Sequence, residues 1–144
     1  MHALLQRVSE ASVTIEGRRV AQIGAGLLIF VAVVPDDSAV IAAKLADRSL
    51  DLRIFADASK PMNRSVVDMA GEVLVVSQFT LAADTRRGRR PSFDSAAAPD
   101  QARTLYQVFV ERVRQRLGAV ATGEFGGDMK VALVNDGPVT FLLN

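Results

Sequence analysis

The sequence predicts a single domain of the mixed α/β class that spans residues 1–144. Apolar runs rich in β-branched residues recur between glycines and prolines, as is typical of strands. Two longer segments carry apolar residues at helical spacing, which indicates amphipathic helices. A chain of 144 residues, of which 49% are hydrophobic, can bury one core without metal or disulfide support. In order, we expect two strands, two strand–helix units and three closing strands.

The first third of the chain is expected to form a hairpin and then a buried strand. Ala3–Val8 and Ser12–Ile15 are strand-like, Glu16–Gly17 suits a tight turn, and Arg19–Ile23 supplies the returning strand. Leu27–Val34 is a continuous apolar run that ends at a proline. Such a run indicates a strand covered on both faces, so we place it at the centre of the sheet.

Two helices follow from capping signals and apolar spacing. Ser38 and the two aspartates before it are N-cap candidates for a helix from about residue 38 to 50. Pro99 opens the second helix, and Gly118 stands where a helix-ending glycine belongs. The apolar stripe of this second helix consists of Ala102, Leu105, Tyr106, Phe109, Val110, Val113 and Leu117.

The remaining segments are expected to complete the sheet. Leu52–Phe55 and Ser65–Val67 are predicted as short strands, and Val73–Val76 as a strand that leads directly into Ser77. Thr80–Pro99 lacks clean periodicity and is predicted as a long ordered loop or a lid. Three strands then close the chain: Val120–Thr122, Met129–Val134 and Val139–Leu143.

Composition excludes several classes of function. The chain has no cysteine and one histidine, His2, so thiolate chemistry, cysteine-bound metals and an intrachain histidine cluster are excluded. We expect no metal and no cofactor. The net charge of +1 excludes a uniformly basic nucleic-acid coat. The sequence has no secretory signal pattern, and its run Gly26–Pro35 is too short to span a bilayer. We expect a soluble, cytoplasmic protein with neither membrane nor DNA as a partner.

The segment Ser77–Gln78–Phe79–Thr80 is the first candidate for chemistry. It follows an apolar strand and offers hydroxyls, an amide and turning backbone N–H groups at the strand's carboxyl end, where sites of α/β sheets often form. The simpler interpretation is that the two hydroxyls end the strand by bonding nearby backbone groups.

The segment Asn135–Thr140 is the second candidate. Its Gly137–Pro138 bond lies in a predicted turn and could be cis, since the trans preference of such bonds is only ~0.5–1 kcal/mol. A cis bond here could aim the flanking carbonyls at a ligand. An ordinary hairpin turn is the alternative, because Asn, Asp, Gly and Pro are common turn residues.

Four arginines lie close together in the irregular segment: Arg86, Arg87, Arg89 and Arg90. Guanidinium groups bind phosphate in a bidentate manner and stay charged, so this cluster suits RNA or phosphate. A solvated loop of like charges is the alternative. The arginines of the second helix, Arg103, Arg112, Arg114 and Arg116, are predicted to form its solvated face.

Taken together, the two motifs give the chain a strong resemblance to the D-aminoacyl-tRNA deacylases. Ser77–Ala83 and Asn135–Thr140 match the two signature motifs of that family in the expected order. The start of the chain, the arginine segment ADTRRGRRPSF and the segment TGEFGGDM also agree, so the resemblance covers essentially the whole length. Two departures, Lys60–Asn63 and Ala82, lie where no chemistry is expected, although Ala82 could alter packing beside the site.

The resemblance implies a three-layer β/β/α fold and a homodimeric carboxylic ester hydrolase. This enzyme would split the ester between a D-amino acid and the terminal adenosine of tRNA. Ser77, Gln78, Phe79 and Thr80 would line the adenosine and ester pocket, with the backbone N–H groups of the last two near the carbonyl oxygen. A cis Gly137–Pro138 turn, followed by Val139 and Thr140, would enter the partner subunit's pocket and reject L side chains, and Arg7 would hold that turn.

Several points stay open at this stage. Water could attack with help from the terminal ribose 2′-hydroxyl, or Thr80 could be the nucleophile, although no base lies near it in sequence. Glycine has no side chain to reject, so glycine mischarged on tRNA(Ala) should be hydrolysed as well. Two other functions compete with the deacylase. One is a tRNA-binding module without catalysis, and the other is a hydrolase of a different small ester or amide.

Overall fold

The computed structural model describes residues 1–144 and contains six strands, two α-helices and one short 3-10 helix. The predicted mixed α/β class is confirmed. The elements are β1 (His2–Ile15), β2 (Arg18–Ile23), β3 (Gly26–Ala32), α1 (Ala39–Asp51), β4 (Glu72–Ser77), η1 (Phe79–Ala82), α2 (Pro99–Leu117), β5 (Ala121–Thr122) and β6 (Lys130–Leu143).

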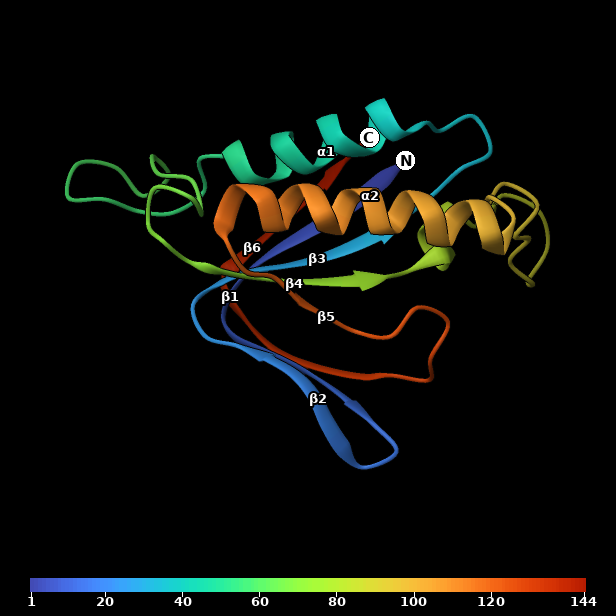
Figure 1. Ribbon diagram of the computed structural model, residues 1–144, viewed down its shortest axis with the longest axis horizontal. Helices are drawn as coiled ribbons and strands as arrows, with labels where there is room; N and C mark the ends of the chain where they lie inside the picture. The colour runs from blue at the N-terminus through green and yellow to red at the C-terminus, as the bar shows by residue number, and fades with distance from the viewer.

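All six strands belong to one curled sheet, and both helices lie side by side on one of its faces (Figure 1). The strand order is β2-β1-β3-β4-β5, and β6 pairs with β1. The long strand β1 is antiparallel to its three neighbours, whereas β3, β4 and β5 run parallel. The strand β3 lies between β1 and β4, which confirms its predicted central position. Neither helix has the length and apolar character needed to cross a membrane.

Two hydrophobic cores define three layers. Alternate residues of β3 point to opposite faces of the sheet, as strand geometry requires. Leu27 and Ile29 belong to the core between the sheet and the helices, together with the fully buried Phe109 of α2. Leu28 belongs to a second core, with Val8 and other residues, that the curled sheet encloses between its own strands. The structure therefore has the expected β/β/α arrangement.

Local signals placed the ends of the elements correctly. Glu16 and Gly17 both have positive φ, 49° and 75°, as a two-residue hairpin turn between twisted strands requires. The Ser38 hydroxyl accepts a hydrogen bond from the Ile41 backbone N–H and caps α1. Gly118 ends α2 in the left-handed conformation, with φ 80°.

Two predicted strands are absent from the sheet. The segment Leu52–Phe55 forms only an isolated bridge between Phe55 and Arg64, and Ser65–Val67 lies in a turn. In that turn the Ser65 N–H donates to the Asp68 carboxylate, and the Asp68 N–H donates to the Ser65 hydroxyl. These bonds satisfy the backbone locally and compete with strand pairing, so the prediction of two strands here was wrong.

The two final predicted strands form one strand, β6. Residues on both sides of the expected turn pair with β1 in the same antiparallel direction: Gln6 lies opposite Thr140, and Val8 lies opposite Asn135. Arg7 alone therefore faces residues 136–139, which leave the ladder as a bulge. The chain does not reverse direction there, because both flanking segments find their hydrogen-bonding partner on the same strand.

Candidate active site

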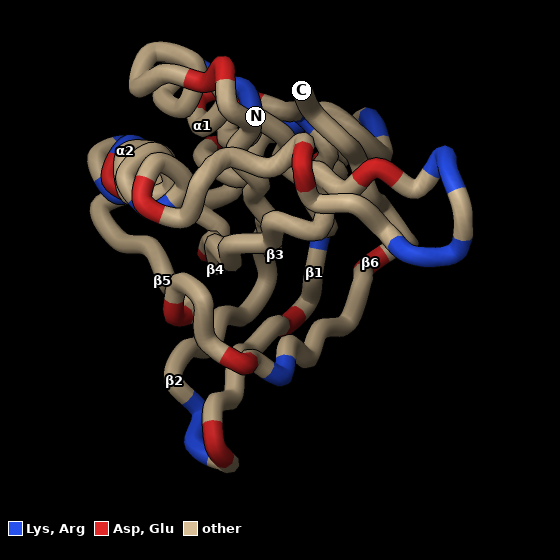
Figure 2. The backbone as a smooth tube through the Cα atoms, turned by 90° about the vertical axis from the view of Figure 1, so that its right-hand side faces the viewer, with Lys and Arg blue, Asp and Glu red and all other residues tan.

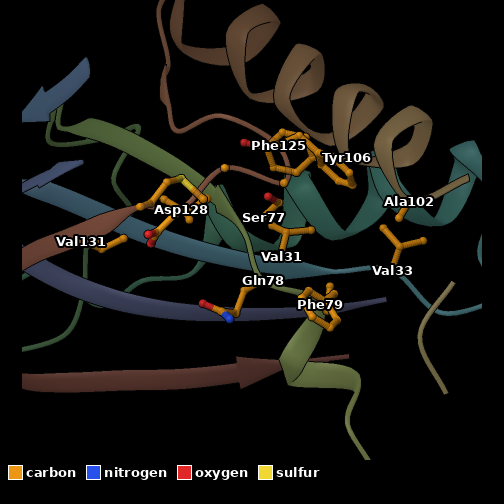
Figure 3. A pocket seen from close by; sticks show the side chains of 15 residues that line it. Val31, Val33, Ser77, Gln78, Phe79, Ala102, Tyr106, Phe125, Asp128 and Val131 are labelled. Carbon is orange, nitrogen blue, oxygen red and sulfur yellow. The ribbon is translucent and has the colours of Figure 1, made fainter. Parts of the chain in front are cut away.

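A cavity of ≈ 340 Å³ lies where β4 ends. Ser77, Gln78 and Phe79 line one side of it, and Tyr106 of α2 and Phe125 of the β5–β6 connection lie on the other (Figure 3). Sequence reasoning placed the first three of these residues in the site and missed the two aromatic side chains. Thr80 is not part of the lining, but it adjoins the cavity through Gln78, whose side-chain amide donates a hydrogen bond to the Thr80 hydroxyl.

Two backbone donors at the end of β4 lack partners. The Gln78 N–H still pairs with the Val31 carbonyl, at 2.8 Å, and then the chain turns into η1. The N–H groups of Phe79 and Thr80 lie in the first turn of η1, where no preceding helical carbonyl can accept from them. Neither group donates to an acceptor in a loop, a cap or a side chain. The turn therefore presents two adjacent donors beside the cavity.

Tyr106 ties the far wall of the cavity to the sheet. Its hydroxyl donates to the Val75 carbonyl of β4 at 3.0 Å, and burial raises the pKa of the phenol, so the group remains a neutral donor. Its ring packs against Phe125 with centroids 5.7 Å apart. In the sequence, helical periodicity explains Tyr106 as a core residue and so gives no sign of a role in a site. The only signal for Phe125 is its place in the segment TGEFGGDM.

The second candidate motif lies on the bulge of β6. The Arg7 guanidinium donates to the carbonyls of Asp136, at 3.1 Å, and Ile54, at 2.6 Å, and so anchors one side of the bulge. The Asn135 side chain accepts from the Val139 N–H at 3.1 Å and donates to the Thr140 hydroxyl at 2.9 Å. The polypeptide between these anchors is held firmly from both sides.

Gly137 and Pro138 occupy the exposed tip of this bulge, and the peptide bond between them is cis. Neither residue, nor Arg7 or Thr140, lines the cavity at the end of β4. Within one chain the structure therefore does not bring the two motifs together.

Comparisons with known proteins identify the family of the chain. The family model of D-Tyr-tRNA(Tyr) deacylase matches residues 4–144. D-aminoacyl-tRNA deacylases from Idiomarina loihiensis and Escherichia coli are 59% and 57% identical over 143 residues, which is 99% of this chain and of each relative. The chain belongs to the D-Tyr-tRNA(Tyr) deacylase family. This membership confirms the predicted resemblance and the predicted class of enzyme, a deacylase.

Solved structures support the same fold for this deacylase. A structure of a protein named c-Myc DNA Unwinding Element Binding Protein has a TM-score of 0.94 at 37% identity and covers 100% of this chain and 98% of its own. A structure described as a probable eukaryotic D-amino acid tRNA deacylase has a TM-score of 0.86 at 19% identity. It covers 99% of this chain and 97% of its own, and it supports the fold alone.

The arginine segment of the deacylase forms a loop that projects from the body (Figure 2). A bridge between Asp84 and Ser92 closes its base. Arg86 forms an ion pair with Asp84 at 2.7 Å, and its hydrogen bonds hold the pKa of that carboxyl well below the usual range. Arg87, Arg89 and Arg90 are exposed and form no ion pair. The loop thus keeps three free guanidinium groups.

Two arginines of α2 do not form a merely solvated face, contrary to the prediction. Arg112 and Arg116 both pair with Asp47 of α1 at 2.9 Å, and Arg116 also reaches Asp51 at 2.6 Å. Hydrogen bonding from Arg112 lowers the pKa of Asp47, which keeps this carboxylate charged. These two arginines join the helices, and periodicity along α2 could not reveal a carboxylate on another helix.

Proposed function

We propose that the chain hydrolyses the ester of D-aminoacyl-tRNA to free D-amino acid and reusable tRNA. The observation that carries this proposal is the pair of unpartnered N–H groups, those of Phe79 and Thr80, beside a cavity at the end of β4. Full-length relatives named D-aminoacyl-tRNA deacylases support the substrate class. The cavity would hold the terminal adenosine, and the ester would lie against the two donors.

The two donors supply the main catalytic contribution in this proposal. Water adds to the ester carbonyl, and the resulting oxyanion accepts hydrogen bonds from both N–H groups. Each donor of this kind is worth ~3–4 kcal/mol in known enzymes. The tetrahedral intermediate then expels the ribose 3′-oxygen, which takes up a proton, and the neighbouring 2′-hydroxyl assists the proton transfer from water.

Thr80 is the weaker candidate for the nucleophile. Its hydroxyl oxygen accepts a hydrogen bond from the Gln78 amide, and no carboxylate or imidazole hydrogen bonds to it. A threonine needs an adjacent base to attack an ester at neutral pH. These contacts favour the substrate's own 2′-hydroxyl as the assisting group.

Chiral selection would come from a second subunit. Gly137 and Pro138 lie on the bulge of β6 and do not line the cavity of their own chain. The apolar side chains of Val134, Phe141 and Leu142 are exposed on the same strand. In a homodimer the partner subunit's Gly137–Pro138 turn would close the cavity and collide with an L side chain. A D side chain would point outward. Selectivity would therefore arise from a steric clash with the L side chain and not from favourable contacts with the D side chain.

The free arginines of the projecting loop would contact the phosphates of tRNA. Replacing Arg87, Arg89 and Arg90 with glutamine is expected to weaken tRNA binding. The slope of log K against log salt should fall by roughly 0.7–0.9 for each lost phosphate contact. Filter binding across a salt series measures this slope. A variant with Arg18, Arg19 and Arg48 changed to glutamine loses the same charge elsewhere. An equal change in its slope would contradict a local role for the loop.

The decisive test of the proposed function follows D-tyrosyl-tRNA and L-tyrosyl-tRNA side by side in the presence of a metal chelator. Loss of the D-ester alone is expected, because the Gly137–Pro138 turn would reject the L side chain. The chelator should not slow this reaction, since neither a metal nor a cysteine takes part in the proposed chemistry. Persistence of both esters, with tRNA still bound, would favour a tRNA-binding module without catalysis. Turnover of small acyl esters that carry no nucleotide would favour a different hydrolase.

Glycyl-tRNA(Ala) serves as the third substrate in the same assay. Since glycine carries no side chain for the Gly137–Pro138 turn to reject, its ester should be hydrolysed along with the D-ester. Survival of glycyl-tRNA(Ala) under conditions that remove the D-ester would show that hydrolysis requires contacts between the pocket and a D side chain. The cytoplasmic location, and the absence of membrane and DNA partners, stay predictions.

A further inference from the structure

Arg103 differs from the other arginines of α2. Arg112 and Arg116 are paired with carboxylates of α1, and Arg114 is paired with Glu111. Arg103 forms no ion pair and instead lies over the ring of Phe125, with its guanidinium carbon 4.7 Å from the ring centroid. Its charge is therefore free, although its side chain is held in place.

Arg103 lines a second cleft that adjoins the cavity. This second hollow, of ≈ 400 Å³, lies between α2 and the β5–β6 connection, and Arg103, Gln107 and Arg114 are among its polar lining residues. Tyr106 and Phe125 line both hollows. A ligand in the cavity that passed the edge of the Phe125 ring would therefore enter a cleft lined by Arg103 and Arg114.

The chemistry of an aminoacylated nucleotide matches this layout. Its ester is attached at the 3′ side of the ribose, and its phosphate leaves from the 5′ carbon on the other side. Phe125 and Tyr106 lie across the cavity from Gln78 and Phe79 (Figure 3). With the ester against the Phe79 N–H, a ribose whose 5′ carbon faced that opposite wall would bring its phosphate to Phe125. Arg103, which stacks on Phe125 and forms no ion pair, supplies a free positive charge beside that wall.

We infer that Arg103 binds the phosphate on the 5′ side of the terminal nucleotide, in the cleft beyond Phe125; this inference rests on the proposed function. Stacking on the aromatic face leaves the N–H edges of the guanidinium available. Such an edge binds two phosphate oxygens at once. Glu111, the carboxylate in the same cleft, is neutralised by Arg114 and does not compete.

The test compares two minimal substrates, the 3′-D-tyrosyl ester of adenosine and the same ester of adenosine 5′-monophosphate. Wild-type turnover of either ester tests the proposed function on its own. For Arg103→Gln, the ratio of the KM for the phosphorylated ester to the KM for the unphosphorylated ester should rise about tenfold, as expected for loss of a hydrogen bond to a charged group. Arg103→Lys should restore part of this ratio, and Arg18→Gln should leave it unchanged.

A second readout uses D-tyrosyl-tRNA. The salt slope of KM should fall by about 0.7 in Arg103→Gln, because one phosphate contact to a single strand is lost. Equal rises of KM for both minimal esters would overturn the inference, since Arg103 would then act only by packing on Phe125. Unchanged KM values for both esters would overturn it as well, and would leave Arg103 as a solvated arginine.

Discussion

Replacing Gly137 with alanine is expected to abolish most of the discrimination between D and L esters. Gly137 has a φ of 131°, and a Cβ atom there would lie 2.7 Å from Val139 Cγ2 and 3.1 Å from an Arg7 guanidinium nitrogen. Val139 is buried and Arg7 is hydrogen bonded, so the tip of the bulge must move instead. A displacement of about 1 Å at a site can change rates by ~10²-fold. We expect a loss of this size in the D:L ratio of kcat/KM.

Gly17 provides the matched control for this substitution. It also has a positive φ, 75°, but a Cβ atom there would meet nothing within 4 Å. Gly17→Ala should cost roughly 1 kcal/mol of stability through backbone strain and leave the D:L ratio unchanged. The ratio is measured with D-tyrosyl- and L-tyrosyl-tRNA at matched protein concentration. An unchanged D:L ratio in a folded Gly137→Ala protein would show that the bulge takes no part in chiral selection.

Mixed dimers separate action within a subunit from action across subunits. Phe79→Pro removes one of the two free N–H donors, and proline suits the first position of a helix. Loss of one such donor costs ~10²–10³ in kcat. If the turn of one subunit serves the cavity of the other, a dimer of Phe79→Pro with Gly137→Ala contains one intact, selective site. If the turn serves its own cavity, each site of the same dimer carries one of the two substitutions, and the dimer contains no intact, selective site.

Replacing Gly26 with alanine is expected to unfold the protein. A Cβ atom at Gly26 would lie 1.8 Å from the Glu72 carbonyl oxygen and 2.7 Å from the Glu72 backbone C and N. These are backbone atoms of the paired strand, so β3 and β4 would have to separate, although both carry fully buried residues. The cost should exceed about 4–5 kcal/mol, a large part of the ~5–15 kcal/mol that stabilises a typical domain.

Urea unfolding followed by circular dichroism measures this loss, and Gly24→Ala is the control. A Cβ atom at Gly24 would meet only a side-chain oxygen of Glu72, at 3.7 Å, so its midpoint should stay close to that of the wild type. A cooperative Gly26→Ala transition near the wild-type midpoint would contradict the close pairing of β3 and β4. Since β4 positions Ser77 and the two free donors, any folded Gly26→Ala protein should also lose deacylation.

The sequence predicted Ser77–Thr80 as a candidate site because strand, turn and polar residues follow one another along the chain. An apolar run ending at Ser77 suffices to place Gln78 and Phe79 at a strand's carboxyl end. The opposite wall could not be predicted in this way, because Tyr106 and Phe125 reach the cavity from elements far along the chain. The same limit applies to Arg103, whose aromatic partner is separated from it by the end of α2 and β5.

Residue types and their order by themselves determined the mixed α/β class, the Glu16–Gly17 turn, the ends of both helices and the two motifs of the family. These features depend on backbone preferences and on hydrogen bonds between near neighbours. Only the tertiary structure decided that β6 is one strand with a projecting bulge, and that the two motifs of one chain stay apart. Those outcomes depend on pairing with β1, which lies at the other end of the chain. The local pattern of apolar residues does not reveal which distant strand a segment pairs with.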